Sequence, residues 1–181
     1  SQALRDAIEM AGMNGHLFVA AAGNSGTDND SVPHYPSSYD SSFVVAVAAT
    51  DSHDQLADFS CFGAESVDLA APGVDVLSTL PNRQYGTLSG TSMATPFVTG
   101  AAALLLSRNA ALEPLSLKRA LLQGLDELPA LKDKMQTGGR LNLAKVVGGS
   151  PVLSLPFDDA GATAEDFTRT EDWNSLPAWT H

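Results

Sequence analysis

A serine at the start of an apolar segment is the strongest chemical signal in the chain. Ser92 lies in GTSMATP, residues 90–96, directly before a long apolar run. In the first turn of a helix, free backbone N–H groups and the positive end of the helix dipole favour negative charge on a nucleophile and on the carbonyl that it attacks. Gly90 permits a close backbone approach at this point. By pattern alone, however, a serine that opens a helix is more often a cap than a nucleophile.

A second polar residue follows a short apolar run near the N-terminus. Asn24 stands in AAAGNSG, residues 20–26. On its own, an asparagine in this position is typical of a turn in which the side chain bonds nearby backbone groups. The interpretation of both Ser92 and Asn24 therefore depends on the wider sequence.

The segment GTSMATPFVTGAAALLL resembles the nucleophile segment of the subtilisin-like serine proteases. That family usually has GTSMA, then Ser or Thr, then Pro-His-Val-Ala-Gly. Phe97 and Thr99 depart from this pattern, since they stand in place of His and Ala. The resemblance continues in a fixed order through AAAGNSG, VPHYPSSYD, VDLAAPGVDVLSTLP and GGRLNLAKVV, and it covers about residues 1–148. The α/β-hydrolases are excluded because their nucleophile lies in Gly-x-Ser-x-Gly.

The resemblance implies a serine endopeptidase that forms an acyl-enzyme. Ser92 would be the nucleophile, and the side-chain amide of Asn24 would bind the oxyanion together with the Ser92 N–H. Gly23 would lie beside the substrate, and His34 would lie on the loop that lines the primary specificity pocket. The resemblance further implies protein or peptide substrates, a secreted or extracellular enzyme, and a cis peptide bond before Pro36.

The family's catalytic Asp and His come from motifs upstream of AAGN, namely Asp-Ser/Thr-Gly and an HGTHVAG-like helix start, and neither motif occurs here. The four histidines, His16, His34, His53 and His181, stand in other contexts. We therefore expect the C-terminal half of a catalytic domain, with the missing N-terminal half as its partner and with no activity alone. The alternative is a pseudoprotease, a non-catalytic subtilisin-like binding or structural module, and the upstream sequence would distinguish the two.

The hydrophobic pattern predicts an α/β fold. Helices are expected at about residues 1–15, 91–107 and 116–125, and strands at 17–23, 43–50, 66–73 and 74–80, with a turn at 81–84. Short apolar runs are typical of parallel strands covered on both faces. With the family resemblance, this order predicts a doubly wound, mainly parallel sheet with helices on both faces. The helix at 91–107 is apolar nearly all round, which predicts that it is buried.

Composition limits the partners and the stabilising groups. A net charge of −11 and a pI near 4.5 argue against nucleic acid. No apolar run is long enough for a membrane span, and no signal-peptide pattern is present. A single cysteine, Cys61, excludes an internal disulfide. It is interpreted as a small buried or half-buried residue and not as a nucleophile, because no His or basic neighbour would lower its pKa. Residues 1–149 read as part of the peptidase domain, and 150–181 as an acidic linker or the start of a further domain.

No metal site is predicted from the residues themselves. Asp28, Asn29 and Asp30 are interpreted as a solvated turn, because the twelve-residue spacing of a calcium loop is absent. Tyr39 and Asp68 match positions near a weak cation site of some relatives. The resemblance therefore leaves room for a structural calcium ion in the full-length protein, and no other cofactor is expected.

Overall fold

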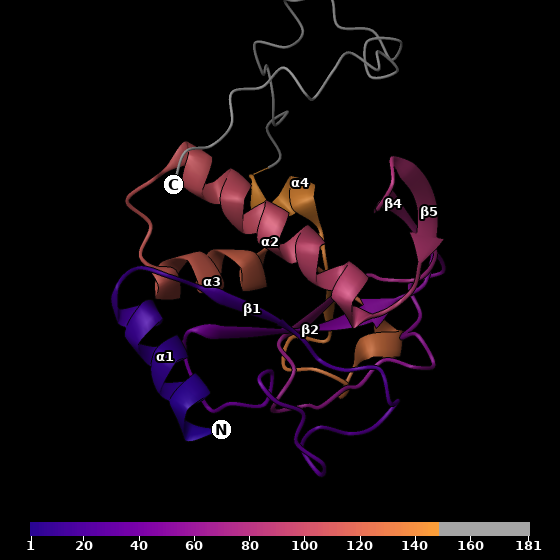
Figure 1. The fold of residues 1–181 in the computed structure, drawn as a ribbon, viewed down its shortest axis with the longest axis horizontal. Coiled ribbons are helices and arrows are strands. Elements are labelled where there is room, and N and C mark those ends of the chain that lie inside the picture. Colours follow the sequence, from indigo (N-terminus) through magenta and orange to yellow (C-terminus); the bar gives the residue numbers. More distant parts are fainter. Residues whose placement is uncertain (149–181) are drawn as a thin grey trace, which may run out of the picture. The chain divides into compact units, whose positions relative to one another are not determined.

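A five-stranded sheet forms the centre of the protein in a computed structural model that describes residues 1–148 (Figure 1). The strand order is β1-β2-β3-β7-β6. Its strands are β1 Phe18–Ala21, β2 Val44–Thr50, β3 Leu69–Pro72, β6 Leu125–Glu127 and β7 Gly139–Leu141. The pairs β1–β2, β2–β3 and β3–β7 are parallel, whereas β6 runs antiparallel to β7. The predicted α/β fold with a mainly parallel sheet is confirmed.

Strand β2, second in the sheet order, is buried along its whole length, as its apolar sequence predicts. All seven of its residues are buried. It pairs with β1 on one side, where Phe18 lies opposite Val44, and with β3 on the other, where Val47 lies opposite Leu69. Continuous burial of this kind is expected of a parallel strand that has helices on both faces.

Helices cover both faces of the sheet (Figure 1). Helix α1, Gln2–Met13, packs through Ile8 against Ala20 and Val44. Its N-terminus is capped by Ser1, whose hydroxyl accepts a hydrogen bond from the backbone N–H of Leu4 at 3.3 Å. Helix α2, Thr91–Arg108, contacts β1, β2 and β3 from the other face and packs against α3, Pro114–Gln123.

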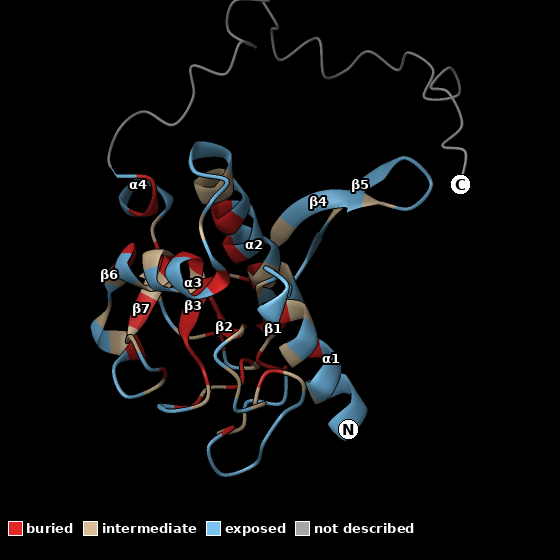
Figure 2. Cartoon of the chain, turned by 90° about the vertical axis from the view of Figure 1, so that its left-hand side faces the viewer, coloured by how far each residue is buried: buried red, intermediate tan, exposed pale blue. Residues whose placement is uncertain are grey.

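Helix α2 is buried on one side only, which corrects the prediction that it is buried all round. Figure 2 shows both buried and exposed stretches along α2. Ala94, Val98 and Ala101 are buried, whereas Phe97 and Thr99 are exposed. A helix that is apolar nearly all round is expected to have protein packed against both of its sides, and residues 1–148 pack against only one side of α2.

The chain segment that connects β3 to α2 forms a hairpin, which projects away from the sheet (Figure 2). Its strands are β4 Val76–Leu80 and β5 Gln84–Leu88, paired antiparallel. The first strand and the turn at 81–84 were predicted, but the second strand was not. Its sequence, QYGTL, has a central glycine and only two large apolar residues, so it lacks a strand signal of its own.

The C-terminal part of the described chain differs most from the prediction. Helix α3 begins at Pro114 rather than Ser116, because proline is well suited to the first position of a helix, where no N–H is needed. Strands β6 and β7, the short helix η1 at Pro129–Leu131 and helix α4 at Leu143–Val146 were not predicted as separate elements. Each has three or four residues, too few to show a hydrophobic period.

The structure also bears on the predicted cis proline and on the question of a membrane span. The Tyr35–Pro36 bond is cis, as predicted. Within residues 1–148, none of the helices is both long and apolar enough to cross a membrane. The interpretation of 150–181 as a linker or the start of a further domain lies outside the described residues.

Candidate active site

The loop after β1 is packed too tightly for any residue but glycine at position 23. Gly23 has φ +114°, in the left-handed region that favours glycine. A Cβ atom there would lie 2.9 Å from Cδ2 of His34 and 3.0 Å from Sγ of Cys61. This packing fixes the backbone from which Asn24 emerges, at the carboxyl end of the parallel strands, where α/β proteins place their ligands.

The start of helix α2 lies directly against Asn24. Gly90 is the N-cap residue, with φ +157°. Its N–H donates to the carbonyl of Gly73 at 2.8 Å, and a Cβ atom on it would lie 3.3 Å from Nδ2 of Asn24. Ser92 is the second residue of the helix and is exposed, so it is not the cap that the bare pattern favours.

Thr91 holds the side chain of Asn24 in one orientation. The Asn24 Oδ1 accepts a hydrogen bond from the Thr91 backbone N–H at 2.8 Å and another from the Thr91 hydroxyl at 2.9 Å. Because a backbone N–H can only donate, the atom that faces it must be the amide oxygen. The Nδ2 group therefore points away from Thr91. Sequence reasoning missed Thr91, although it lies within the GTSMATP motif.

Two hydrogen-bond donors are left without an acceptor within residues 1–148. One is the Nδ2 group of Asn24, and the other is the backbone N–H of Ser92, which precedes the first intrahelical bonds of α2. The positive end of the helix dipole lies at the same point. Two donors beside an exposed serine hydroxyl form a site that can stabilise an oxyanion.

Ser92 borders two hollows, one on each side of the first turns of α2. The first is lined by Ala21, Ser92, Thr95, Pro96 and Thr99, and the second by Val76, Leu77, Ser78, Ser92, Met93, Pro96 and Phe97. Both linings are mainly apolar, and the second includes the base of the β4–β5 hairpin. The serine is thus reachable from either side of the helix.

None of the histidines within residues 1–148 is hydrogen-bonded to Ser92. His16 and His53 are exposed, as predicted, and their rings lie beside the Ala11 carbonyl and the Ser52 hydroxyl. The His34 ring lies against Gly23 and beside the Ser37 hydroxyl at 3.3 Å. His34 is therefore close to the Asn24 loop, while His181 lies outside the described residues.

Cys61 is buried beneath the same loop, in agreement with the prediction. Burial by itself would raise the pKa of the Cys61 thiol, but hydrogen bonds with the hydroxyls of Ser25 and Thr27 outweigh it and lower the pKa. None of these hydrogen-bond partners is a His or a basic residue. Hydroxyl donors stabilise a thiolate without any basic residue, and they were not considered.

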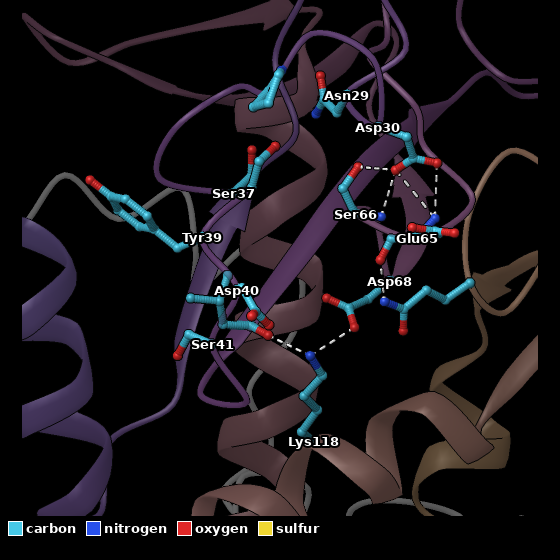
Figure 3. Close-up of a pocket in the computed structure, with 14 residues that line it drawn as sticks. Asn29, Asp30, Ser37, Tyr39, Asp40, Ser41, Glu65, Ser66, Asp68 and Lys118 are labelled. Carbon is cyan, nitrogen blue, oxygen red and sulfur yellow. Dashed lines mark hydrogen bonds and ion pairs between the residues drawn. The ribbon is translucent and has the colours of Figure 1, made fainter. Parts of the chain in front are cut away.

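A polar hollow that does not include Ser92 is lined by residues from the loops and from α3, among them Asp68 and Lys118 (Figure 3). Its main ion pair joins the Lys118 ammonium to Oδ1 of Asp68 at 2.8 Å. The same ammonium donates to the carbonyl of Val44 at 2.5 Å, and Oδ2 of Asp68 accepts from the N–H of Ala46 at 2.7 Å. The charge of Asp68 is thus balanced within the protein. Tyr39 also lines this hollow, but its hydroxyl bonds Ser1.

The Asp28–Asp30 segment is only partly the solvated turn that was predicted. Asp28 does form a turn, accepting from the N–H of Asp30, but Asn29 is 1% exposed. Its Nδ2 donates to the carbonyl of Ala22 at 2.9 Å, which satisfies the backbone just beyond β1 and draws the side chain inward. Within residues 1–148, no cluster of three or more His, Cys, Asp or Glu side chains is arranged to hold a metal ion.

The fold and the site define an α/β protein with a serine at a helix N-terminus beside a fixed amide donor. Residues 1–146 match the Subtilase family, and the chain belongs to that family of serine peptidases. It is 50% identical over 109 residues to subtilisin DY of Bacillus licheniformis, covering 60% of this chain and 39% of the relative. It is 42% identical over 125 residues to a thermophilic serine proteinase of Bacillus sp. (strain AK1), covering 69% and 29%.

Solved structures show the same likeness. A cold-adapted subtilisin-like serine proteinase has 39% identity and a TM-score of 0.68, covering 78% of this chain and 50% of that one. The prenylagaramide maturation protease PagA has 34% identity and a TM-score of 0.70, covering 81% and 55%. The chain therefore spans about half or less of these relatives, while its fold is subtilisin-like.

Proposed function

We propose that the chain is the nucleophile-bearing half of a serine endopeptidase that hydrolyses peptide bonds through an acyl-enzyme. The observation that carries this proposal is the fixed amide of Asn24 beside the exposed Ser92 at the N-terminus of α2. Ser92 would attack the carbonyl of the substrate. Nδ2 of Asn24 and the Ser92 N–H would hold the oxygen as it becomes negative.

The general base would come from a segment upstream of this chain. A serine hydroxyl stays protonated near neutral pH, so attack requires a base within hydrogen-bond reach. Strand β1 is paired only with β2 among the described strands, and its Ala21 lines a hollow together with the exposed Pro96 and Thr99 of α2. A preceding strand and helix that cover these surfaces would bring a His, oriented by an Asp, to the hollow at Ser92. The same strand and helix would also bury the apolar residues that are exposed on α2 within residues 1–148.

The substrates would be proteins or peptides, and the enzyme would act outside the cell, as the family membership favours. Gly23 and His34 would contact the substrate. Gly23 directly precedes Asn24 in the chain, and the ring of His34 packs against Gly23. A structural cation would belong to parts of the full-length protein beyond the Asp68 hollow, since Lys118 already neutralises Asp68.

Labelling by a fluorophosphonate tests the proposal, because this reagent reacts with activated serines. The isolated chain is expected to remain unlabelled, and a polypeptide that includes the upstream half is expected to label and to hydrolyse a peptide. Ser92→Ala should abolish both reactions. Ser107→Ala removes another serine hydroxyl from α2, one bonded to the Leu104 carbonyl, and should leave both unchanged.

Asn24→Ala should reduce kcat by about 10² to 10³ and leave KM nearly unchanged, because the amide acts on the transition state. Two results would contradict the proposal. One is ready labelling of the isolated chain at Ser92, and the other is a full-length enzyme whose activity survives Ser92→Ala. A full-length protein that folds but never labels would instead favour the pseudoprotease.

A further inference from the structure

We infer that the β4–β5 hairpin joins two copies of this protein, through antiparallel pairing of the outer edge of β5 with the same edge of a second copy. The contact turns two separate hairpins into one four-stranded sheet. This inference does not depend on the proposed function, because the surface that it uses includes neither Ser92 nor Asn24.

The outer edge of β5 is unpaired within residues 1–148. Its residues, Gln84–Leu88, pair with β4 alone, and no hydrogen bond of the described chain joins them to another segment. The hairpin projects away from the sheet (Figure 2), and an isolated pair of strands is only marginally stable in water. The backbone N–H and C=O groups on this edge are therefore available to a further strand.

The hairpin strands lack the features that usually prevent edge-to-edge association. Natural edge strands carry a lysine, a proline or a bulge for this purpose. Strands β4 and β5 contain no charged residue and no proline, and they pair without a bulge along their whole length. Large apolar side chains are exposed on them instead, since Tyr85 is 73% exposed and Leu77 is 68% exposed. An edge of this kind is suited to the addition of a strand from another chain.

The distribution of charge favours a second copy as the source of the added strand. The chain has a net charge of −11, so two copies repel each other over most of their surfaces. Residues 76–88 are different, because Arg83 is the only charged residue among them. Two copies can therefore meet at this hairpin without bringing acidic groups together.

A two-fold register centred on Gly86 matches the side chains of the two copies. With Gly86 opposite its own counterpart, Tyr85 lies opposite Thr87 of the second copy, and both side chains point to the same face of the sheet. Leu77 pairs with Thr87 within each hairpin and so adds to this face. Aromatic and β-branched side chains form favourable cross-strand pairs, and the diagonal spacing of about 7 to 8 Å lets the two Tyr85 rings reach each other.

The same register brings opposite charges together at both ends of the contact. Arg83 directly precedes β5 and comes to lie opposite Ser89 of the second copy. The Ser89 hydroxyl accepts from the Asp75 N–H at 2.9 Å and lies 3.4 Å from Oδ1 of Asp75. Arg83 of each copy therefore lies beside Asp75 of the other, and the two-fold symmetry forms this pair twice.

Sedimentation equilibrium of the full-length polypeptide tests the inference. The protein carries Ser92→Ala, so that self-digestion cannot remove chains during the measurement. A five-residue edge forms a small interface, so we expect a weak dimer that appears between about 10 μM and about 1 mM protein and weakens as salt is added. A protein that stays monomeric over this whole range overturns the inference.

Exchanging the charges tests the register. Arg83→Glu and Asp75→Lys each place like charges at both ends of the contact, and each should weaken the dimer by about tenfold or more. An equal mixture of the two variants should associate as tightly as the unaltered protein, because the introduced glutamate then faces the introduced lysine and Arg83 faces Asp75. Arg119→Glu makes the same change of charge at an exposed position on α3 and should leave association unchanged. A mixture that remains monomeric, or an equal loss in Arg119→Glu, overturns the inference.

Hydrogen exchange decides the matter if either hairpin variant fails to fold. In the Ser92→Ala protein, the outward N–H groups of residues 84–88 should exchange more slowly at about 1 mM than at about 10 μM, whereas exchange in α1 should not change. Equal exchange of 84–88 at both concentrations overturns the inference. Slow exchange of these groups already at the lower concentration means that another part of the full-length chain covers the edge, and it overturns the inference as well.

Discussion

Replacing Lys118 with methionine should destabilise the protein far more than the loss of an exposed lysine would. The ammonium of Lys118 lies 2.8 Å from Oδ1 of Asp68, and their side chains are 19% and 5% exposed. Methionine has a similar length and fills similar space but leaves the Asp68 carboxylate with only the N–H of Ala46 as a partner. The variant therefore isolates the effect of the missing charge.

The geometry gives the size of the effect. At 2.8 Å and an effective dielectric constant of about 20, the attraction between the two charges is about 6 kcal/mol before the cost of removing them from water. Breaking a buried pair by deleting one partner typically costs about 3 to 5 kcal/mol. The partial exposure of Lys118 places the expected loss near the lower end, at about 3 kcal/mol.

Urea denaturation followed by circular dichroism measures the free energy of unfolding. Lys118→Met combined with Asp68→Asn removes both charges and should cost less than Lys118→Met alone, because no buried charge is then left unpaired. Lys118→Arg preserves the charge and should cost the least of the three. A loss below about 1 kcal/mol in Lys118→Met, or a double variant that is less stable than the single one, would refute this reasoning.

Three further predictions concern packing and pH. Gly124→Ala should cost about 1 to 3 kcal/mol, seen as a lower Tm, because a Cβ atom would lie 2.6 Å from the backbone N and Cα of Val146. Leu121→Ala should cost about 2 to 5 kcal/mol in urea denaturation, because Leu121 is 0% exposed; a loss under 1 kcal/mol would contradict its place in the core. Burial of Asp30 opposes ionisation, but the Ser66 hydroxyl and nearby backbone N–H groups lower its pKa below 3.8. Its carboxylate therefore stabilises the fold above pH 3.8 and loses this effect as the pH falls through the lowered pKa. In Asp30→Asn, the free energy of unfolding should therefore fall less steeply as the pH is lowered into the acid range. An unchanged dependence on pH would exclude a contribution from Asp30.

Local sequence was sufficient for elements that carry a strong pattern. The apolar run at 43–50 predicted the buried strand β2, and the Gly-Thr-Ser start of α2 predicted where that helix begins. Strands β6 and β7 could not be predicted in this way, because each has three residues and is held by pairing with a distant segment. The pairing of Ala70 with Arg140, for example, depends on the whole intervening chain being folded.

The same distinction holds for the candidate site. Motif and resemblance pointed to Ser92, Asn24, Gly23 and His34, and the structure brings Gly23, Asn24 and the start of α2 together. Thr91 and Lys118 were missed because their roles are defined by partners far away in sequence. A threonine next to a candidate nucleophile and a lysine on an amphipathic helix have no distinctive pattern until the fold shows what they contact.

The parallel pairing of β3 with β7 affects the order of events as the chain is synthesised. Helices α2 and α3 both lie in the connection between these strands, so the loop that closes when they pair contains Ser92. Closing so long a loop costs entropy before the new contacts compensate for it. While the ribosome has yet to release Leu141, the sheet beneath α2 lacks its fourth strand. A nascent chain therefore carries Ser92 on a sheet that β7 and β6 have yet to join, and the sheet is complete only once translation has passed Leu141.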